Sequence, residues 1–117
     1  MEDFLELMDT VYKEIKKIAE DNHLEEVCGF VLEKDGKLFV QEAYNEAENK
    51  EELFQINPIQ YLKAFKASDE IIAVFHSHPQ GAADPSSFDI EMAKHCCLDF
   101  LIYSLEFDEF KLHKYND

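Results

Sequence analysis

Two histidines stand two positions apart in the segment His-Ser-His-Pro at residues 76–79, directly after the apolar run at residues 71–75. The run has the length and composition of a buried central strand, and residues two apart on a strand point to the same side. Both imidazoles therefore aim at one point near the strand's end, where Pro79 stops the ladder. Two convergent imidazoles suit a zinc ion, although the pair taken alone is equally typical of surface or capping histidines.

A carboxylate that could complete such a site is Asp89, in the segment Ser-Ser-Phe-Asp at residues 86–89. The same Ser-x-x-Asp pattern predicts a capping box that begins a helix over about residues 86–97. A helix that starts one loop after the histidines holds Asp89 in its first turn, from where the side chain can face them. Two imidazoles and one carboxylate leave a tetrahedral zinc ion one open position, the arrangement of a catalytic site.

An acidic pair, Glu25 and Glu26, precedes Cys28-Gly29 at the start of an expected strand over about residues 27–33. A carboxylate beside a metal can take a proton from water and return it to a leaving group. The pair can instead belong to the solvated acidic surface. Only one of the two can face the site, because neighbours on a strand point to opposite sides.

Taken together, Glu26-x-Cys28-Gly29, His76-x-His78-Pro79 and Ser86-x-x-Asp89 resemble the JAMM motif of the JAB/MPN family of metallopeptidases. The resemblance spans about residues 26–105. It implies an α/β fold, a single mixed-sheet JAMM domain related to the cytidine deaminases with flanking helices, and one Zn²⁺. The reaction that it implies is hydrolysis of a peptide or isopeptide bond, with an expected substrate at the C-terminus of a ubiquitin-like or other small protein.

The resemblance also implies a role for each motif residue. His76, His78 and Asp89 would bind the metal, and Ser86 would hydrogen-bond the tetrahedral intermediate or the water. Glu26, rather than Glu25, would be the general base and then the acid, since the family has its glutamate two residues before Cys-Gly.

The segment at residues 96–104, Cys-Cys-Leu-Asp-Phe-Leu-Ile-Tyr-Ser, resembles the prokaryotic JAB branch, which includes phage tail-assembly proteins and processors of sulfur-carrier or ubiquitin-like proteins. Glu33-Lys34 stands where family members often have a further glycine. Asp89 lies 28 residues before the end of the 117-residue sequence, which leaves no room for the insertion that holds distal ubiquitin in eukaryotic members. We therefore do not expect selective cleavage of ubiquitin chains.

The elements that must position these residues can be read from periodicity. An apolar stripe that includes Phe4, Met8, Val11, Ile15 and Ile18 predicts a helix over about residues 3–20. Asp35-Gly36 predicts a hairpin between strands at about 27–33 and 37–44. A polar loop at 45–52, a short strand at 53–56 and a helix from Asn57-Pro58 to about residue 66 follow, the helix with Ile59, Leu62 and Phe65 at helical spacing. Strands at 100–105 and 109–113 complete one expected domain over residues 1–117.

Composition restricts the partners and the compartment. The chain has 26 acidic and 11 basic residues, a net charge of −15, which disfavours binding to nucleic acid or to an anionic membrane. Such a charge attracts a basic partner surface or keeps a small protein soluble. No apolar run is long enough to span a membrane, and the acidic N-terminus is unlike a signal peptide, so we expect a cytoplasmic protein. Three cysteines without a C-x-x-C pair predict reduced thiols.

Two other classes of function remain open at this point. One is a non-catalytic MPN-type scaffold or phage tail-assembly component, which need not bind zinc. The other is a zinc nucleobase deaminase, which needs His-x-Glu followed by Pro-Cys-x-x-Cys. His23-Leu24-Glu25 has the first spacing, but the cysteine half is absent. The sequence leaves the identity of the substrate and the oligomeric state open.

Overall fold

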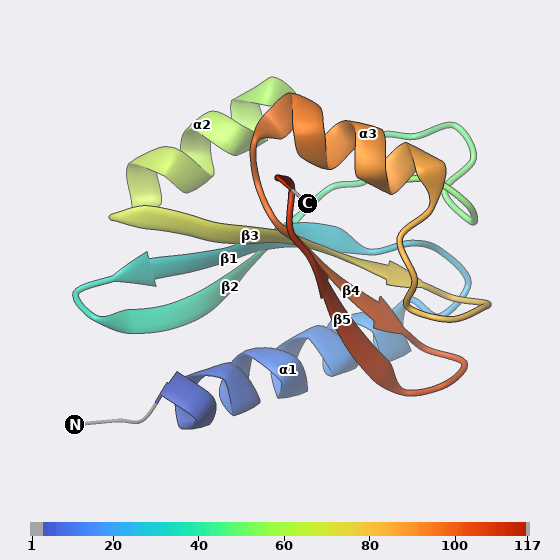
Figure 1. Ribbon diagram of the computed structural model, residues 1–117, viewed down its shortest axis with the longest axis horizontal. Coiled ribbons are helices and arrows are strands. Elements are labelled where there is room, and N and C mark those ends of the chain that lie inside the picture. Colours follow the sequence, from blue (N-terminus) through green and yellow to red (C-terminus); the bar gives the residue numbers. More distant parts are fainter. Residues whose placement is uncertain (1–3, 117) are drawn as a thin grey trace.

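The computed structural model describes residues 4–116, in which five strands form one mixed sheet of order β2-β1-β3-β4-β5 (Figure 1). The β3–β4 pair is parallel and the other neighbours are antiparallel. Helix α1 covers one face of the sheet, and α2 and α3 cover the other. This arrangement confirms the predicted α/β class. In chain order the elements are α1 (Phe4–Asp21), β1 (Cys28–Lys34), β2 (Lys37–Ala43), α2 (Pro58–Ala67), β3 (Glu70–His78), α3 (Ser87–Cys96), β4 (Phe100–Ser104) and β5 (Glu109–His113).

Helix α1 packs on the sheet through one apolar stripe, as its periodicity predicts. Val11, Ile15 and Ala19 are buried against Val31 and Phe75 of the sheet. The predicted first residue, residue 3, and the side chains of the first two helical residues lie outside the described part of the chain. The next side chains along β1, Phe30 and Leu32, enter the second core beneath α2 and α3, because alternate residues of a strand face opposite sides.

The hairpin between β1 and β2 forms at the predicted dipeptide. Asp35 has φ 53° and Gly36 has φ 77°, the pair of positive angles that a tight turn between right-twisted strands requires. Lys34 and Lys37 pair across the turn, which fixes the register of the two strands.

The predicted short strand at residues 53–56 is wrong. This segment alternates exposed Leu53 and Gln55 with buried Phe54 and Ile56, a strand-like pattern, but it joins no strand. The side chain of Asn45 takes the place of a partner strand: its Oδ1 accepts from the Gln55 N–H at 3.0 Å and its Nδ2 donates to the Leu53 carbonyl at 2.9 Å. A side chain that imitates a neighbouring strand leaves no signal in the periodicity.

Helix α2 begins as predicted. The Asn57 side chain caps it by accepting from the Ile59 N–H at 2.8 Å, and Pro58 is its first residue. The side that faces the core is made by fully buried Ala64 and by Tyr61, whose ring meets Phe30 edge-on at 5.1 Å.

Strand β3 runs further than the apolar run predicts, to His78, so that both histidines lie within the sheet. His76 and His78 pair with Ile102 and Ser104 of the parallel strand β4. The three cysteines are free, as predicted. Among the helices of residues 4–116, none has the length and apolar character of a membrane span.

Candidate metal centre

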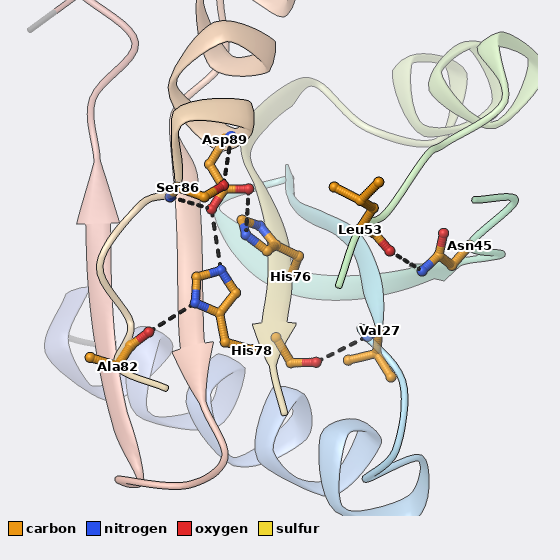
Figure 2. A network of polar contacts seen from close by, with 9 residues as sticks. Val27, Asn45, Leu53, His76, His78, Ala82, Ser86 and Asp89 are labelled. Atoms are coloured by element: carbon orange, nitrogen blue, oxygen red, sulfur yellow. Dashed lines mark hydrogen bonds and ion pairs between the residues drawn. The ribbon is translucent and has the colours of Figure 1, made fainter. Parts of the chain in front are cut away.

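The two histidines project from the C-terminal end of β3 toward the first turn of α3 (Figure 2). Their ring centroids are 5.1 Å apart. The His76 ring is completely buried and lies flat against Phe54, at 4.5 Å between centroids, with Phe100 at its edge. The His78 ring is partly exposed. Spacing along one strand therefore does bring the two rings to one place, as the sequence predicts.

Asp89 reaches both rings from the helix. Its Oδ1 lies 3.1 Å from His76 Nε2, and its Oδ2 lies 3.2 Å from His78 Nε2. The capping box is also present: the Ser86 N–H donates to Asp89 Oδ2 at 2.9 Å, and the Asp89 N–H donates to Ser86 Oγ at 3.0 Å. The two interpretations of Ser-x-x-Asp are thus compatible, because the cap is what fixes the carboxylate over the imidazoles (Figure 2).

The hydrogen bonds of the rings test whether a cation fits between them. His78 Nδ1 donates to the Ala82 carbonyl at 2.8 Å. In the neutral ring, Nε2 is then an acceptor that faces another acceptor, the Asp89 carboxylate, so either an added proton or a cation must lie between them. Histidines that bind a metal through one ring nitrogen usually donate a hydrogen bond from the other to a carbonyl or carboxylate, as His78 Nδ1 does here.

His76 gives an independent indication. Within the described residues, neither of its ring nitrogens has a hydrogen-bond partner, although Nε2 is at ion-pair distance from Asp89. A buried, unpartnered nitrogen is costly unless something else satisfies its lone pair. Zinc bonds of 2.0–2.1 Å place tetrahedral ligand atoms roughly 3.3 Å apart, which is close to the 3.1 and 3.2 Å separations here. The donor set of His76, His78 and Asp89 fits zinc in its chemistry, and each ring nitrogen lies at about a ligand-to-ligand distance from one of the two Asp89 oxygens.

The charges of Asp89 and His76 agree with that fit, whereas burial lowers the pKa of His78 but its hydrogen bonds to Asp89 and the Ala82 carbonyl outweigh it and raise that pKa. Burial raises the pKa of the Asp89 carboxyl, but the adjacent His76 and His78 rings outweigh it and hold this pKa well below the usual range. Burial lowers the pKa of His76 despite the nearby carboxylate. An ionised carboxylate and a neutral imidazole are the forms that bind a metal.

Glu26 lies beside the histidines, whereas Glu25 is exposed to solvent. A carboxylate oxygen of Glu26 and one nitrogen from each of His76 and His78 all lie within 4.8 Å of one another. Glu26 is only 6% exposed, and burial raises the pKa of its carboxyl to about 8, with the His78 charge lowering it and Asp89 and Glu52 raising it. No described residue hydrogen-bonds or ion-pairs with this carboxylate. Glu26 is therefore placed to exchange protons near neutral pH.

The backbone around Glu26 is held from both sides. Asn45 Nδ2 donates to the Glu26 carbonyl at 2.9 Å, and the Glu26 N–H donates to the Lys50 carbonyl. The next residue, Val27, donates its N–H to Ser77 Oγ at 2.9 Å, and its carbonyl accepts from the Ser77 N–H at 3.0 Å. The residue between the two histidines thus ties the strand that carries them to the segment that carries the glutamate.

A cleft of about 680 Å³ opens over the centre. Glu26, His78, Pro79 and Ser86 line it, and Ser86 is exposed to solvent. The remaining lining residues are His23, Leu24, Glu51, Glu52, Gln80 and Leu105. This volume is within the range of ligand-binding clefts in proteins.

Sequence reasoning found five residues that meet here, Glu26, His76, His78, Ser86 and Asp89, and their chemical roles stay predictions. It did not find Asn45, Phe54, Ser77 or Glu52. Asn45 and Glu52 lie in a loop whose sequence predicts only a polar segment, and an apolar residue such as Phe54 is predicted to lie in the core. Ser77 could have been found, because a small polar residue between two inward histidines must point to the opposite face of the sheet.

Comparisons with known proteins agree with this geometry. A family model described as prokaryotic homologs of the JAB domain matches residues 8–113. No curated protein matches the chain. Among solved structures, the solution structure of protein DSY2949 from Desulfitobacterium hafniense is similar at 25% identity and a TM-score of 0.64, over 92% of this chain and 77% of that one.

Two further solved structures are similar in fold. A structure described as "JAMM: A Metalloprotease-like Zinc Site in the Proteasome and Signalosome" matches at 16% identity and a TM-score of 0.56. AF2198, a JAB1/MPN domain protein from Archaeoglobus fulgidus, matches at 15% identity and a TM-score of 0.59. Each match covers 90% of this chain and 82% of the other. The fold of the chain is therefore the JAB/MPN fold, which is related to JAMM metalloproteases.

Proposed function

The chain belongs to the family of prokaryotic homologs of the JAB domain, and we propose that it is a zinc-dependent metallopeptidase that hydrolyses a peptide or isopeptide bond. The observation that carries this proposal is the Asp89 carboxylate at 3.1 and 3.2 Å from two imidazole nitrogens. One of those rings is fully buried and has no hydrogen-bond partner among the described residues. Neither a solvated acidic surface nor a helix cap by itself would explain a buried imidazole without a hydrogen-bond partner.

His76, His78 and Asp89 would hold the zinc ion. When bound, zinc would supply the Lewis acidity that activates water and polarises a scissile carbonyl. Glu26 takes the proton of the attacking water on its carboxylate. It then gives that proton to the amine that leaves when the carbon–nitrogen bond breaks, so one residue serves as base and acid. Its raised pKa, about 8 before any metal is bound, supports both halves of this exchange near neutral pH.

Ser86 stabilises the negative oxygen that forms during attack. Its Oγ already accepts a hydrogen bond from the Asp89 N–H, so its own proton is free to donate into the cleft. A donor aimed at developing charge is worth about 3 kcal/mol of transition-state stabilisation in other hydrolases. The capping serine would in this way contribute to both helix and catalysis.

The proposed substrate is an extended C-terminal segment of a ubiquitin-like or other small protein. Such a segment would enter the cleft that Glu26, His78 and Ser86 line, and the net charge of −15 argues against nucleic acid. We propose that the reaction takes place in the cytoplasm.

The test combines zinc analysis with turnover of ubiquitin-like fusion proteins. We expect His78→Ala to lose both zinc and activity, because it removes a ligand. Glu26→Gln should keep zinc and lose activity, because the amide keeps the shape but cannot take a proton. Glu25→Gln is the matched control and should keep both. Turnover by Glu26→Gln at the wild-type rate would contradict the mechanism, and a purified protein that takes up no zinc would favour the scaffold.

A further inference from the structure

Helix α2 exposes an apolar stripe on the side away from the sheet. Ile59, Leu62 and Phe65 follow one another at intervals of three residues and are 61%, 51% and 70% exposed. With 3.6 residues per turn, these positions lie away from Ala64, the residue that the helix buries. Three large apolar side chains that are each more than half exposed, side by side on one short helix, mark an interaction surface rather than scattered surface residues.

The charge of this helix is the reverse of the rest of the chain. The net charge is −15, yet α2 contains Lys63 and Lys66 and no acidic residue, and both other helices of residues 4–116 contain acids. Both lysines are exposed. On a helical wheel, Lys66 falls between Leu62 and Ile59, and Lys63 falls on the other side of Ile59. The stripe and the lysines therefore form one apolar and basic surface, which we call the α2 surface.

We propose that the α2 surface binds an acidic amphipathic helix of another protein. An apolar stripe on such a helix would cover Ile59, Leu62 and Phe65, and its flanking carboxylates would meet Lys63 and Lys66. Helix α2 has ten residues and is about 15 Å long, which accommodates roughly three turns of a partner helix packed along it. Burial supplies the attraction, and the lysines select the sign of the partner's charge.

Two other occupants fit the observations less well. A second copy of this chain would bring another charge of −15, and a symmetric contact of α2 with itself would set lysine against lysine. An anionic membrane is much wider than one helix, so it would also face the acidic residues outside the α2 surface that give the chain its charge of −15. The acidic helix of another protein satisfies both the apolar and the charged part of the surface.

The probe is a synthetic helical peptide with leucines at helical spacing flanked by glutamates, labelled for fluorescence anisotropy. A second peptide has lysines in place of the glutamates. The wild-type protein should bind the glutamate peptide at least tenfold more tightly, with the preference shrinking as salt is added. Phe65→Ser should weaken this binding about tenfold or more, because it removes the aromatic anchor.

Phe107→Ser is the matched control, because Phe107 is 58% exposed but lies in the turn between β4 and β5, outside the surface. It should bind like the wild type, and both serine variants should melt within a few degrees of it, since neither opens the core. The double variant Lys63→Glu, Lys66→Glu should reverse the preference toward the lysine peptide.

Four results would overturn the proposal: no saturable binding of the glutamate peptide, equal affinity for the two peptides, undiminished binding by Phe65→Ser, or a preference that the charge reversal leaves unchanged. Binding of phosphatidylserine vesicles without binding of the peptide would assign the surface to a membrane instead. Dimerisation that Phe65→Ser abolishes would assign it to a second copy.

Discussion

Asn45→Ala removes the side chain that holds the loop after β2 and the segment that carries Glu26 in one place. The Asn45 amide makes four hydrogen bonds to main-chain groups, all between 2.9 and 3.0 Å. Two of the partners, the Glu26 carbonyl and the Ala47 N–H, belong to residues that are 6% exposed. The other two belong to exposed Leu53 and Gln55, where water can replace the amide.

The size of the effect follows from the two buried groups. A buried donor or acceptor left without a partner costs about 1–3 kcal/mol, so we expect Asn45→Ala to lose about 2–4 kcal/mol in the free energy of unfolding. For a chain of 117 residues this lowers the melting temperature by about 10 °C. Turnover should fall as well, because the Glu26 backbone loses the bond that fixes its position.

Urea unfolding of the metal-free protein measures this directly. Asn49→Ala is the matched control, because Asn49 is an exposed asparagine of the same loop whose side chain bonds, among residues 4–116, to Glu52 alone. It should change the free energy of unfolding by less than about 0.5 kcal/mol. If the two variants unfold at the same urea concentration, the Asn45 hydrogen bonds do not organise this loop and the reasoning is refuted.

Three further changes have expected outcomes. Burial raises the pKa of Glu26 from 4.5 to about 8, so the stability that its protonated form gives the fold is full below pH 4.5 and is lost as the pH rises toward 8. With the metal removed by chelator, the free energy of unfolding of Glu26→Gln should therefore rise by about 2–4 kcal/mol relative to the wild type between pH 5 and 8.5, and a difference in urea midpoints that does not change with pH would contradict this. Gly29→Ala would place a Cβ under 3.0 Å from the Gln41 carbonyl oxygen and the Phe75 ring, so it should cost about 2–3 kcal/mol by thermal melting, and an unchanged melting temperature would show that β1 can shift. Glu52→Lys should raise KM severalfold for peptides with lysine beside the scissile bond and not for neutral ones, and equal changes for both would exclude Glu52 as a charge-selecting residue of the cleft.

The parts of the fold that the sequence predicts are those with local signals. Asp35-Gly36 requires positive φ at both positions, and the stripe of α1 and the apolar run of β3 carry their own periodicity. The strand order β2-β1-β3-β4-β5 has no such signal, because it depends on contacts between distant segments. The false strand at residues 53–56 arises in the same way, since only the fold shows that Asn45 occupies the partner's place.

The site divides along the same line. His76, His78 and Asp89 are two short motifs on adjacent elements, so their meeting can be predicted from strand alternation and a helix cap. Phe54 stacks on His76 from a segment more than twenty residues away, and the residues around Phe54 carry no pattern that predicts this contact. The helical spacing of α2 likewise predicts a helix but not that its stripe faces outward, because only the packing of Ala64 and Tyr61 in the fold shows which side is buried.

The most direct test of the metal centre is a crystal structure of the protein purified with zinc, with anomalous data collected at the zinc absorption edge. We expect a single strong peak roughly 2.1 Å from Nε2 of His76, Nε2 of His78 and one oxygen of Asp89. A map without a peak there, with the Asp89 oxygens still at 3.1 and 3.2 Å from the two rings, would show that the carboxylate only bonds the histidines and that this chain holds no metal at this site.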